Sequence, residues 1–291
     1  MDIRAIGMGL AFALMWSSAF TSARIIVADA SPLFALALRF LISGLLGVAI
    51  AAIMGQSWRL TRMQWYATIL FGICQNALYL GLNFVAMQTV EAGLAAIIAS
   101  TMPLLVALAS WLIFKERLGA LGIAGLFAGL AGVALIMGAR INAGVDLFGV
   151  MLCGIGVTAL AFATLALRGA TTGGNFLMVV GLQMLVGSAI LAVAAISFET
   201  PYINPSWPLF WAFAYTTLVP GLAATLVWFL LVNRIGAIRA ATFHFLNPFF
   251  GVAIAAVLLG EALGPRDILG VTIITAGILA VQLARQNNKP A

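Results

Sequence analysis

The sequence predicts an all-α integral membrane protein in which ten transmembrane helices form two five-helix repeats of inverted topology. Three observations support this fold: an apolar composition, apolar runs of membrane-spanning length, and a pattern that recurs along the chain. Of the 291 residues, 64% are apolar and 8% are charged, whereas a soluble domain is about a quarter charged. Most of the surface must therefore face the lipid bilayer, which excludes a soluble monomer.

The apolar runs have the length of membrane-spanning helices. Each covers roughly twenty residues, enough for a helix to cross a hydrocarbon core of about 30 Å, whereas the strands of a membrane barrel alternate over about ten residues. Cutting the chain at charged residues, prolines and glycines gives ten segments, at 5–28, 33–54, 65–87, 92–114, 119–138, 147–169, 175–196, 208–232, 238–260 and 265–284. The connections are short, so any binding site must lie among the helices.

The basic residues indicate how these helices are oriented. Assigned to alternate sides, ten lie on the side of the N-terminus and three on the other, while Arg39 lies inside the second segment. The ten are Arg4, Arg59, Arg62, Lys115, Arg117, Arg168, Arg234, Arg239, Arg285 and Lys289. Cytoplasmic loops are enriched in basic residues, so both termini are predicted to be cytoplasmic and the protein to lie in the plasma (inner) membrane. Because these charges are scattered, nucleic acid is not an expected partner despite a net charge of +6.

One sequence pattern occurs twice, at a constant separation of 145 residues. Its two copies are Pro103, Glu116, Gly125 and Gly132, and Pro248, Glu261, Gly270 and Gly277. At this offset, 11 of 41 ungapped positions are identical. We therefore predict a duplication, with residues 1–140 as the first five-helix repeat and 146–291 as the second. Five is an odd number, so the second repeat crosses the membrane in the opposite direction, an architecture typical of secondary transporters.

These residues also carry a resemblance to a known family. The run Trp16-Ser17-Ser18-Ala19-Phe20, the pair Ser31-Pro32 followed by Arg39-Phe40, and the doubled pattern resemble the drug/metabolite transporter superfamily, and more narrowly its ten-helix EamA-type exporters. The resemblance covers essentially the whole chain, which is similar to the amino-acid exporters of that family. It implies a secondary transporter that exports small metabolites by alternating access.

Two prolines are predicted to interrupt helices at the membrane midplane. Pro103 and Pro248 fall near the centres of the fourth and ninth segments, where each removes one backbone hydrogen bond and frees the carbonyl of Ala99 or His244. Such carbonyls line polar cavities in other transporters. The alternative is a kink whose carbonyls are satisfied by neighbouring side chains or water.

Polar side chains within the spans suggest where a substrate binds. His244 and Asn247 share one helical face, and Asn76, Tyr79 and Asn83 follow one face of the third segment. An imidazole within lipid must face protein or water, whereas membrane asparagines also serve as helix-to-helix contacts. We predict that substrate lies at the midplane between the two halves, touched by side chains of both groups.

Further candidates would complete this site with apolar surface. Trp16, Ser17 and Phe20 form an aromatic and hydroxyl edge on the first helix, and Met102 lies beside Pro103. Packing against a neighbouring helix is the alternative for this edge. The neutral set of donors and acceptors suits a small neutral or zwitterionic substrate, with aromatic or apolar amino acids favoured. A broad-specificity drug or metabolite carrier is the first alternative, ahead of a channel.

The remaining candidates are expected to be structural. Arg39 is expected to tie down a loop carrying Asp29 or Glu91, and Glu116 and Glu261 to form ion pairs at helix ends. The glycines of the repeat, Gly125, Gly132, Gly270 and Gly277, are expected to allow close helix packing, either within the chain or in a dimer.

The sequence predicts neither an enzyme nor a cofactor. A metal site is not expected because His244 has no second histidine or cysteine at ligand spacing, and Cys74 and Cys153 are expected to be packing residues. With one histidine the chain cannot carry HExxH, and paired intramembrane aspartates are also missing from the sequence.

The charge asymmetry makes the predicted topology testable. Single cysteines introduced at Asn142 and Tyr202 should react with a membrane-impermeant thiol reagent in intact cells, because these loops are predicted to be external. A cysteine at Gln56 should stay unlabelled. Labelling at Gln56 alone would reverse the predicted orientation.

Overall fold

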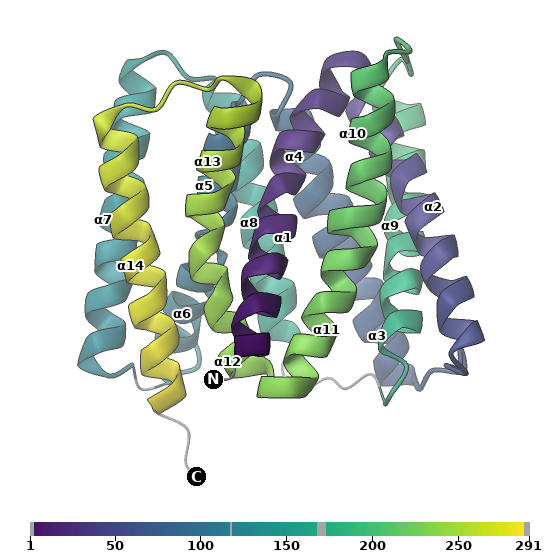
Figure 1. Cartoon of the computed structure of the whole chain (residues 1–291), viewed down its shortest axis with the longest axis horizontal. Coiled ribbons are helices and arrows are strands. Elements are labelled where there is room, and N and C mark those ends of the chain that lie inside the picture. Colours follow the sequence, from purple (N-terminus) through teal and green to yellow (C-terminus); the bar gives the residue numbers. More distant parts are fainter. Residues whose placement is uncertain (1–2, 117, 168–172, 288–291) are drawn as a thin grey trace. The chain divides into compact units, whose positions relative to one another are not determined.

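A computed structural model of the chain describes residues 3–116, 118–167 and 173–287, and most of these residues are helical (Figure 1). The elements are α1 (Ile3–Asp29), α2 (Pro32–Ile53), α3 (Arg62–Phe71), η1 (Gly72–Leu80), α4 (Gly81–Ala86), α5 (Ala92–Ala99), α6 (Met102–Leu112), α7 (Ala120–Asn142), α8 (Leu147–Ala166), α9 (Phe176–Phe198), α10 (Trp207–Leu218), η2 (Val219–Ala223), α11 (Ala224–Ile235), α12 (Ala237–Thr242), η3 (Phe243–Leu246), α13 (Asn247–Leu259) and α14 (Pro265–Asn287).

These elements make ten stretches that are long and apolar enough to cross a membrane, which confirms the predicted all-helical membrane fold. The third span, for example, joins α3, η1 and α4, and the fourth joins α5 and α6. Of the basic residues that predicted the orientation, Arg117, Arg168 and Lys289 lie outside the described residues, as does the end of the predicted sixth segment.

The helices group into two compact units, and each unit draws on both halves of the sequence. The first unit comprises Met1–Thr21, Val90–Val150 and Val227–Ala291, and the second comprises Ser22–Thr89 and Met151–Leu226. Within the first unit, the start of α1 and the end of α14 lie at the same end (Figure 1). An even number of spans requires this arrangement of the termini.

In the first unit, α7 packs along α14 through glycines (Figure 1). A Cβ atom added to Gly125 would lie 2.7 Å from the carbonyl oxygen of Gly277, and one added to Gly132 would lie 2.9 Å from that of Gly270. Position numbers rise along one helix as they fall along the other, so the two helices are antiparallel. The repeat glycines thus serve close packing within the chain.

This seam also has the form of a two-fold contact. The 145-residue offset exchanges Gly125 with Gly270 and Gly132 with Gly277, so it converts each of the two glycine contacts into the other. Self-complementary contacts of this kind arise when two equivalent parts are related by a two-fold axis. The seam is therefore the direct structural expression of two inverted repeats.

The fourth and ninth spans are both broken near their middle, as the two prolines predicted. In the fourth span α5 ends at Ala99 and α6 begins at Met102, and in the ninth η3, a short 3-10 segment, separates α12 from α13. Pro103 and Pro248 are each the second residue of the helix that follows the break, where a missing amide hydrogen costs least.

A carboxylate from the end of the ninth span caps the fourth. Glu261 accepts hydrogen bonds from the backbone amides of Ala92 at 2.6 Å and Gly93 at 2.8 Å, the first residues of α5. These amides have no partner within their own helix, and the helix dipole favours a negative charge there. Glu261 therefore caps the start of α5, a contact that the sequence did not predict.

In the second unit, α2 packs along α9 (Figure 1). The Ser188 hydroxyl donates to the carbonyl oxygen of Ala37 at 2.8 Å, and Glu199 accepts from the amides of Leu33 and Phe34. The start of α2 is thus capped by a carboxylate at the end of its neighbour, as α5 is in the first unit.

Two spans of the second unit contain π-helical turns, which the sequence did not predict. η1 lies in the third span and η2 in the eighth, and the 145-residue offset places η2 inside the range equivalent to η1. The helices that lead into them begin at equivalent caps, since Thr61 accepts from the amide of Gln64 and Ser206 from that of Leu209. Pro220 lies within η2, whereas η1 contains no proline.

Enlarging a glycine of the α7–α14 seam should destabilise the protein. A Cβ atom on Gly277 would lie 2.6 Å from both the carbonyl oxygen of Gly125 and the amide nitrogen of Gly129. Gly277→Ala should therefore cost about 1–3 kcal/mol through overpacking, seen as a lower midpoint of thermal unfolding in detergent. Gly138→Ala on α7, which meets open space, is the matched control and should be neutral or stabilising. Equal unfolding midpoints for the two variants would contradict the close packing of α7 against α14 at Gly277.

Candidate functional site

The predicted site residues form one group in each unit, and the first unit holds an aromatic cluster around His244. The ring centroid of His244 lies 5.2 Å from that of Phe12, with the rings edge to face, and 5.1 Å from that of Trp228. Phe12 in turn contacts Trp16 and Trp228, at 5.6 and 4.7 Å. Aromatic pairs at these separations attract one another beyond the burial of their surfaces.

A short polar chain adjoins this cluster. The Asn247 side-chain amide donates to Nδ1 of His244 at 3.0 Å, so a neutral imidazole carries its proton on Nε2. The Ser17 hydroxyl donates to the backbone carbonyl of Asn247 at 3.3 Å. The side-chain oxygen of Asn247 is buried and has no hydrogen-bond partner in the described part of the chain. One acceptor and one ring N–H are thus available beside the aromatic rings.

Other predicted residues of the first unit lie at the helix breaks and on the first helix. Ala99 and Met102 flank the break in the fourth span and are half-buried, whereas Phe20, Pro103 and Pro248 are buried. Sequence reasoning missed Phe12 and Trp228. The repeat could have pointed to Trp228, because the 145-residue offset makes it the equivalent of Asn83. Phe12 could not have been found in this way, since it is one apolar residue among many on α1.

In the second unit, the predicted residues Asn76, Tyr79 and Asn83 have different neighbouring helices. A Cβ atom on Gly187 of α9 would lie 2.4 Å from the Cβ atom of Asn76, so Asn76 packs against α9. The backbone of Tyr79 and the amide of Asn83 instead face Gly156 of α8. The π-helical turn η1 contains the first two residues, and its wider turn moves them off the stripe expected for an α-helix.

The second group nevertheless keeps one unsatisfied polar atom. The Asn83 side-chain nitrogen donates to the carbonyl oxygen of Tyr79 at 2.7 Å, while its side-chain oxygen is buried without a partner among the described residues. Cys74 and Cys153 are buried free thiols, as expected of packing residues. Cys153 lies on α8 three residues before Gly156, the residue that faces the backbone of Tyr79.

Arg39 does not make the contact predicted for it in the second unit. Asp29 instead accepts a hydrogen bond from the Ser206 hydroxyl at 2.5 Å. The Arg39 side chain is buried, with its guanidinium carbon 5.0 Å from the ring centroid of Phe40, and its Nε atom has no partner within the described ranges. A Cβ atom on Gly221 of η2 would lie 3.6 Å from its Nη2 atom, so Arg39 packs against the π-helical turn of the eighth span.

A charged cluster at one end of the first unit joins one arginine to two carboxylates. Arg140 binds Glu91 at 2.6 Å and Asp267 at 3.1 Å, and Asp267 also accepts from the backbone amide of Gly264 at 2.9 Å. Glu91 is therefore engaged within the first unit. Across the described residues, no three His, Cys, Asp or Glu side chains gather in a way that could hold a metal ion.

Comparison with known proteins gives matches over nearly the full length of the chain. The sequence profile described as the EamA-like transporter family matches residues 3–138 and 147–283. A protein named "Uncharacterized transporter YvbV" from Bacillus subtilis (strain 168) is 26% identical over 279 residues, covering 96% of this chain and 91% of that protein. The "Uncharacterized inner membrane transporter YedA" of Escherichia coli (strain K12) is 28% identical over 290 residues, covering 95% and 90%.

A solved crystal structure has the same fold. It superposes with a TM-score of 0.72 at 23% sequence identity, over 99% of this chain and 100% of that chain.

Removing the central cation of the charged cluster should destabilise the first unit. Arg140→Met would leave Asp267, whose side chain is 9% exposed, without its counter-charge. The cost should be about 3 kcal/mol, the low end for a broken buried pair, because the Glu91 side chain is 41% exposed. Thermal unfolding in detergent measures this loss, with Arg59→Met on an exposed connection as the control. A variant as stable as the control would contradict the pairing.

Proposed function

We propose that this chain, which belongs to the EamA-like transporter family, exports small neutral or zwitterionic metabolites, above all aromatic or apolar amino acids, by alternating access. Its class as a secondary membrane transporter follows from the family. The substrate and the direction of transport are our proposal. We also propose that it resides in the plasma (inner) membrane with both termini in the cytoplasm, in keeping with the inner-membrane name of YedA and the predicted charge asymmetry.

The observation that carries this proposal is the set of interruptions within four spans. The fourth and ninth spans break at equivalent prolines, and the third and eighth carry π-helical turns at equivalent positions. Non-helical backbone occurs at membrane depth only where it is buried in protein or lines a water-filled cavity. Transporters bind substrate at such breaks in their helices. Paired interruptions in inverted repeats free similar backbone groups in the two halves, which supports two related states of the kind that alternating access uses.

The groups beside these breaks suit a zwitterion. The unpartnered side-chain oxygen of Asn247 can accept from an ammonium group, and Nε2–H of His244 can donate to a carboxylate. The rings of Phe12, Trp16 and Trp228 offer apolar surface to a side chain. These side chains are neutral, which favours a substrate of no net charge over an anion or a cation.

Counterflow in proteoliposomes tests the substrate. Proteoliposomes that contain the purified protein and are loaded with unlabelled phenylalanine should accumulate labelled phenylalanine from outside. Other aromatic or branched amino acids should compete with this uptake. His244→Ala and Asn247→Ala should each weaken apparent affinity by roughly tenfold to a hundredfold, because each removes a buried hydrogen bond worth about 1–3 kcal/mol. Asn76→Ala tests whether the second group serves the same substrate.

The control for these variants is Ser197→Ala, since Ser197 is exposed and bonds only to the preceding turn of its own helix. Parent-like transport by both first-unit variants, at matched protein content, would show that these residues are helix contacts only. Saturable flux without counterflow of any amino acid would reject the proposed substrate, and non-saturable flux would indicate a channel.

A further inference from the structure

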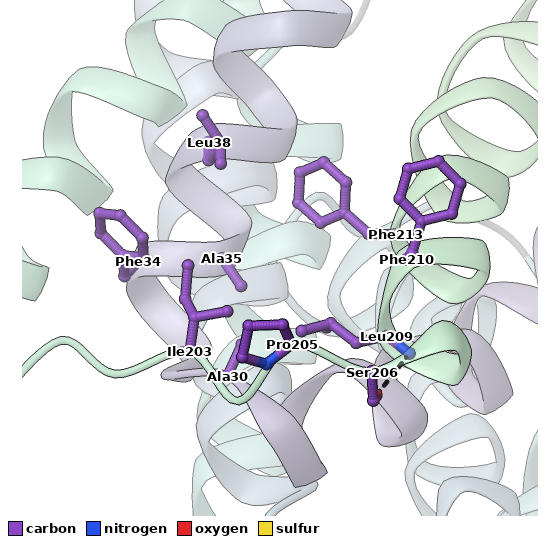
Figure 2. A pocket seen from close by; sticks show the side chains of 10 residues that line it. All are labelled: Ala30, Phe34, Ala35, Leu38, Ile203, Pro205, Ser206, Leu209, Phe210 and Phe213. Carbon is purple, nitrogen blue, oxygen red and sulfur yellow. Dashed lines mark hydrogen bonds between the residues drawn. The ribbon is translucent and has the colours of Figure 1, made fainter.

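An apolar groove opens on the second unit, between the starts of α2 and α10. Figure 2 shows Phe34 and Leu38 of α2 on one side, Phe210 and Phe213 of α10 on the other, and Ile203 of the preceding connection between them. The groove encloses about 260 Å³, and Ser206 is the one polar residue among those that line it. Its rim is open, since Ile203 is 50% and Phe210 56% exposed.

The groove lies within the apolar layer of the membrane near one surface. α2 begins at Pro32 and α10 at Trp207, so Leu38 and Phe213 are each about 9 Å into their spans at 1.5 Å per residue. Trp207 and Trp211 are exposed on α10, which is typical of residues that sit at the membrane interface. The open side of the groove is therefore expected to face lipid acyl chains.

The carboxylate of Asp29 adjoins Ser206, the polar residue of the groove lining. Ser206 donates to the carboxylate of Asp29 at 2.5 Å, and the same hydroxyl oxygen accepts from the amide of Leu209, a bond drawn in Figure 2. The backbone carbonyl of Asp29 accepts from the amide of Asn204, which holds the connection against the end of α1. No Lys or Arg side chain in the described ranges forms an ion pair with Asp29.

We propose that this groove binds one lipid whose headgroup ends in a primary ammonium, such as phosphatidylethanolamine, with an acyl chain between α2 and α10. The apolar lining matches the chain, and the carboxylate at the polar end attracts the ammonium, which can also donate hydrogen bonds to it. A choline headgroup has the same charge but no N–H donor. The site therefore distinguishes ethanolamine from choline lipids, and it is independent of the transported substrate.

Native mass spectrometry of the full-length protein tests this site. The protein is reconstituted in vesicles of phosphatidylethanolamine and phosphatidylcholine in equal amounts with identical acyl chains, and the lipids that it retains are then identified. We expect about fivefold more retained ethanolamine lipid, the factor that corresponds to about 1 kcal/mol for one hydrogen bond that a choline headgroup does not make. Asp29→Asn should lower the ratio toward one while leaving lipid bound, because the neutral amide oxygen accepts a weaker hydrogen bond from the ammonium than the carboxylate does.

A second variant tests the apolar part. Ile203→Trp should fill the groove and lower the retention of both lipids, whereas Val193→Trp, at a 67% exposed position on α9, should retain lipid as the parent does. A ratio near one in the parent, an unchanged ratio in Asp29→Asn, or equal retention by the two tryptophan variants would each overturn the proposal. If Asp29→Asn does not fold, the parent ratio and the tryptophan pair decide the result.

Discussion

Hydrocarbon offers no hydrogen-bond partner to a peptide group, so the chain must satisfy its own helix ends wherever they approach the apolar layer. It does so with carboxylates from segments far away in sequence: Glu261 caps α5, and Glu199 caps α2. Of the eight acidic residues, Asp2 is outside the described part, and the other seven lie at helix ends or in the connections. The acidic side chains thus serve helix termini and connections, and among the described residues none lies in the interior of a span.

The same requirement explains why the broken spans pack within the units. Each break exposes carbonyls and amides that lipid cannot solvate, and bringing backbones close together hides them. Glycines provide this closeness where helices of the two repeats meet, as Gly125 does at Gly277 and Gly251 does at Ala96. Pairing helices across the repeats also draws both halves of the sequence into each unit, so neither five-helix repeat coincides with a compact body.

The ten spans, the antiparallel repeat and the proline breaks were all predictable, because each depends on local composition or on a residue type with one strong backbone effect. The site was only partly predictable. Asn76 and Asn83 separate because η1 widens a turn, and the choice between two helical hydrogen-bond patterns depends on packing that a short sequence does not reveal. Likewise, the sequence predicts only an ion pair at a helix end for Glu261. Its hydrogen bond to the start of α5 joins segments that are distant in the sequence, which local patterns do not reveal.

The two π-helical turns bear on how closely the two halves of the chain correspond in length. A π-helical turn accommodates one more residue than the α-helical turn it replaces. Had that residue entered one half after the halves separated, the 145-residue spacing would shift by one across it. The spacing is instead the same before the turns, at the caps Thr61 and Ser206, and after them, at Ala92 and Ala237. The two halves therefore hold the same number of residues across these turns, so the π-helical geometry is accommodated equally in both although the side chains around it differ.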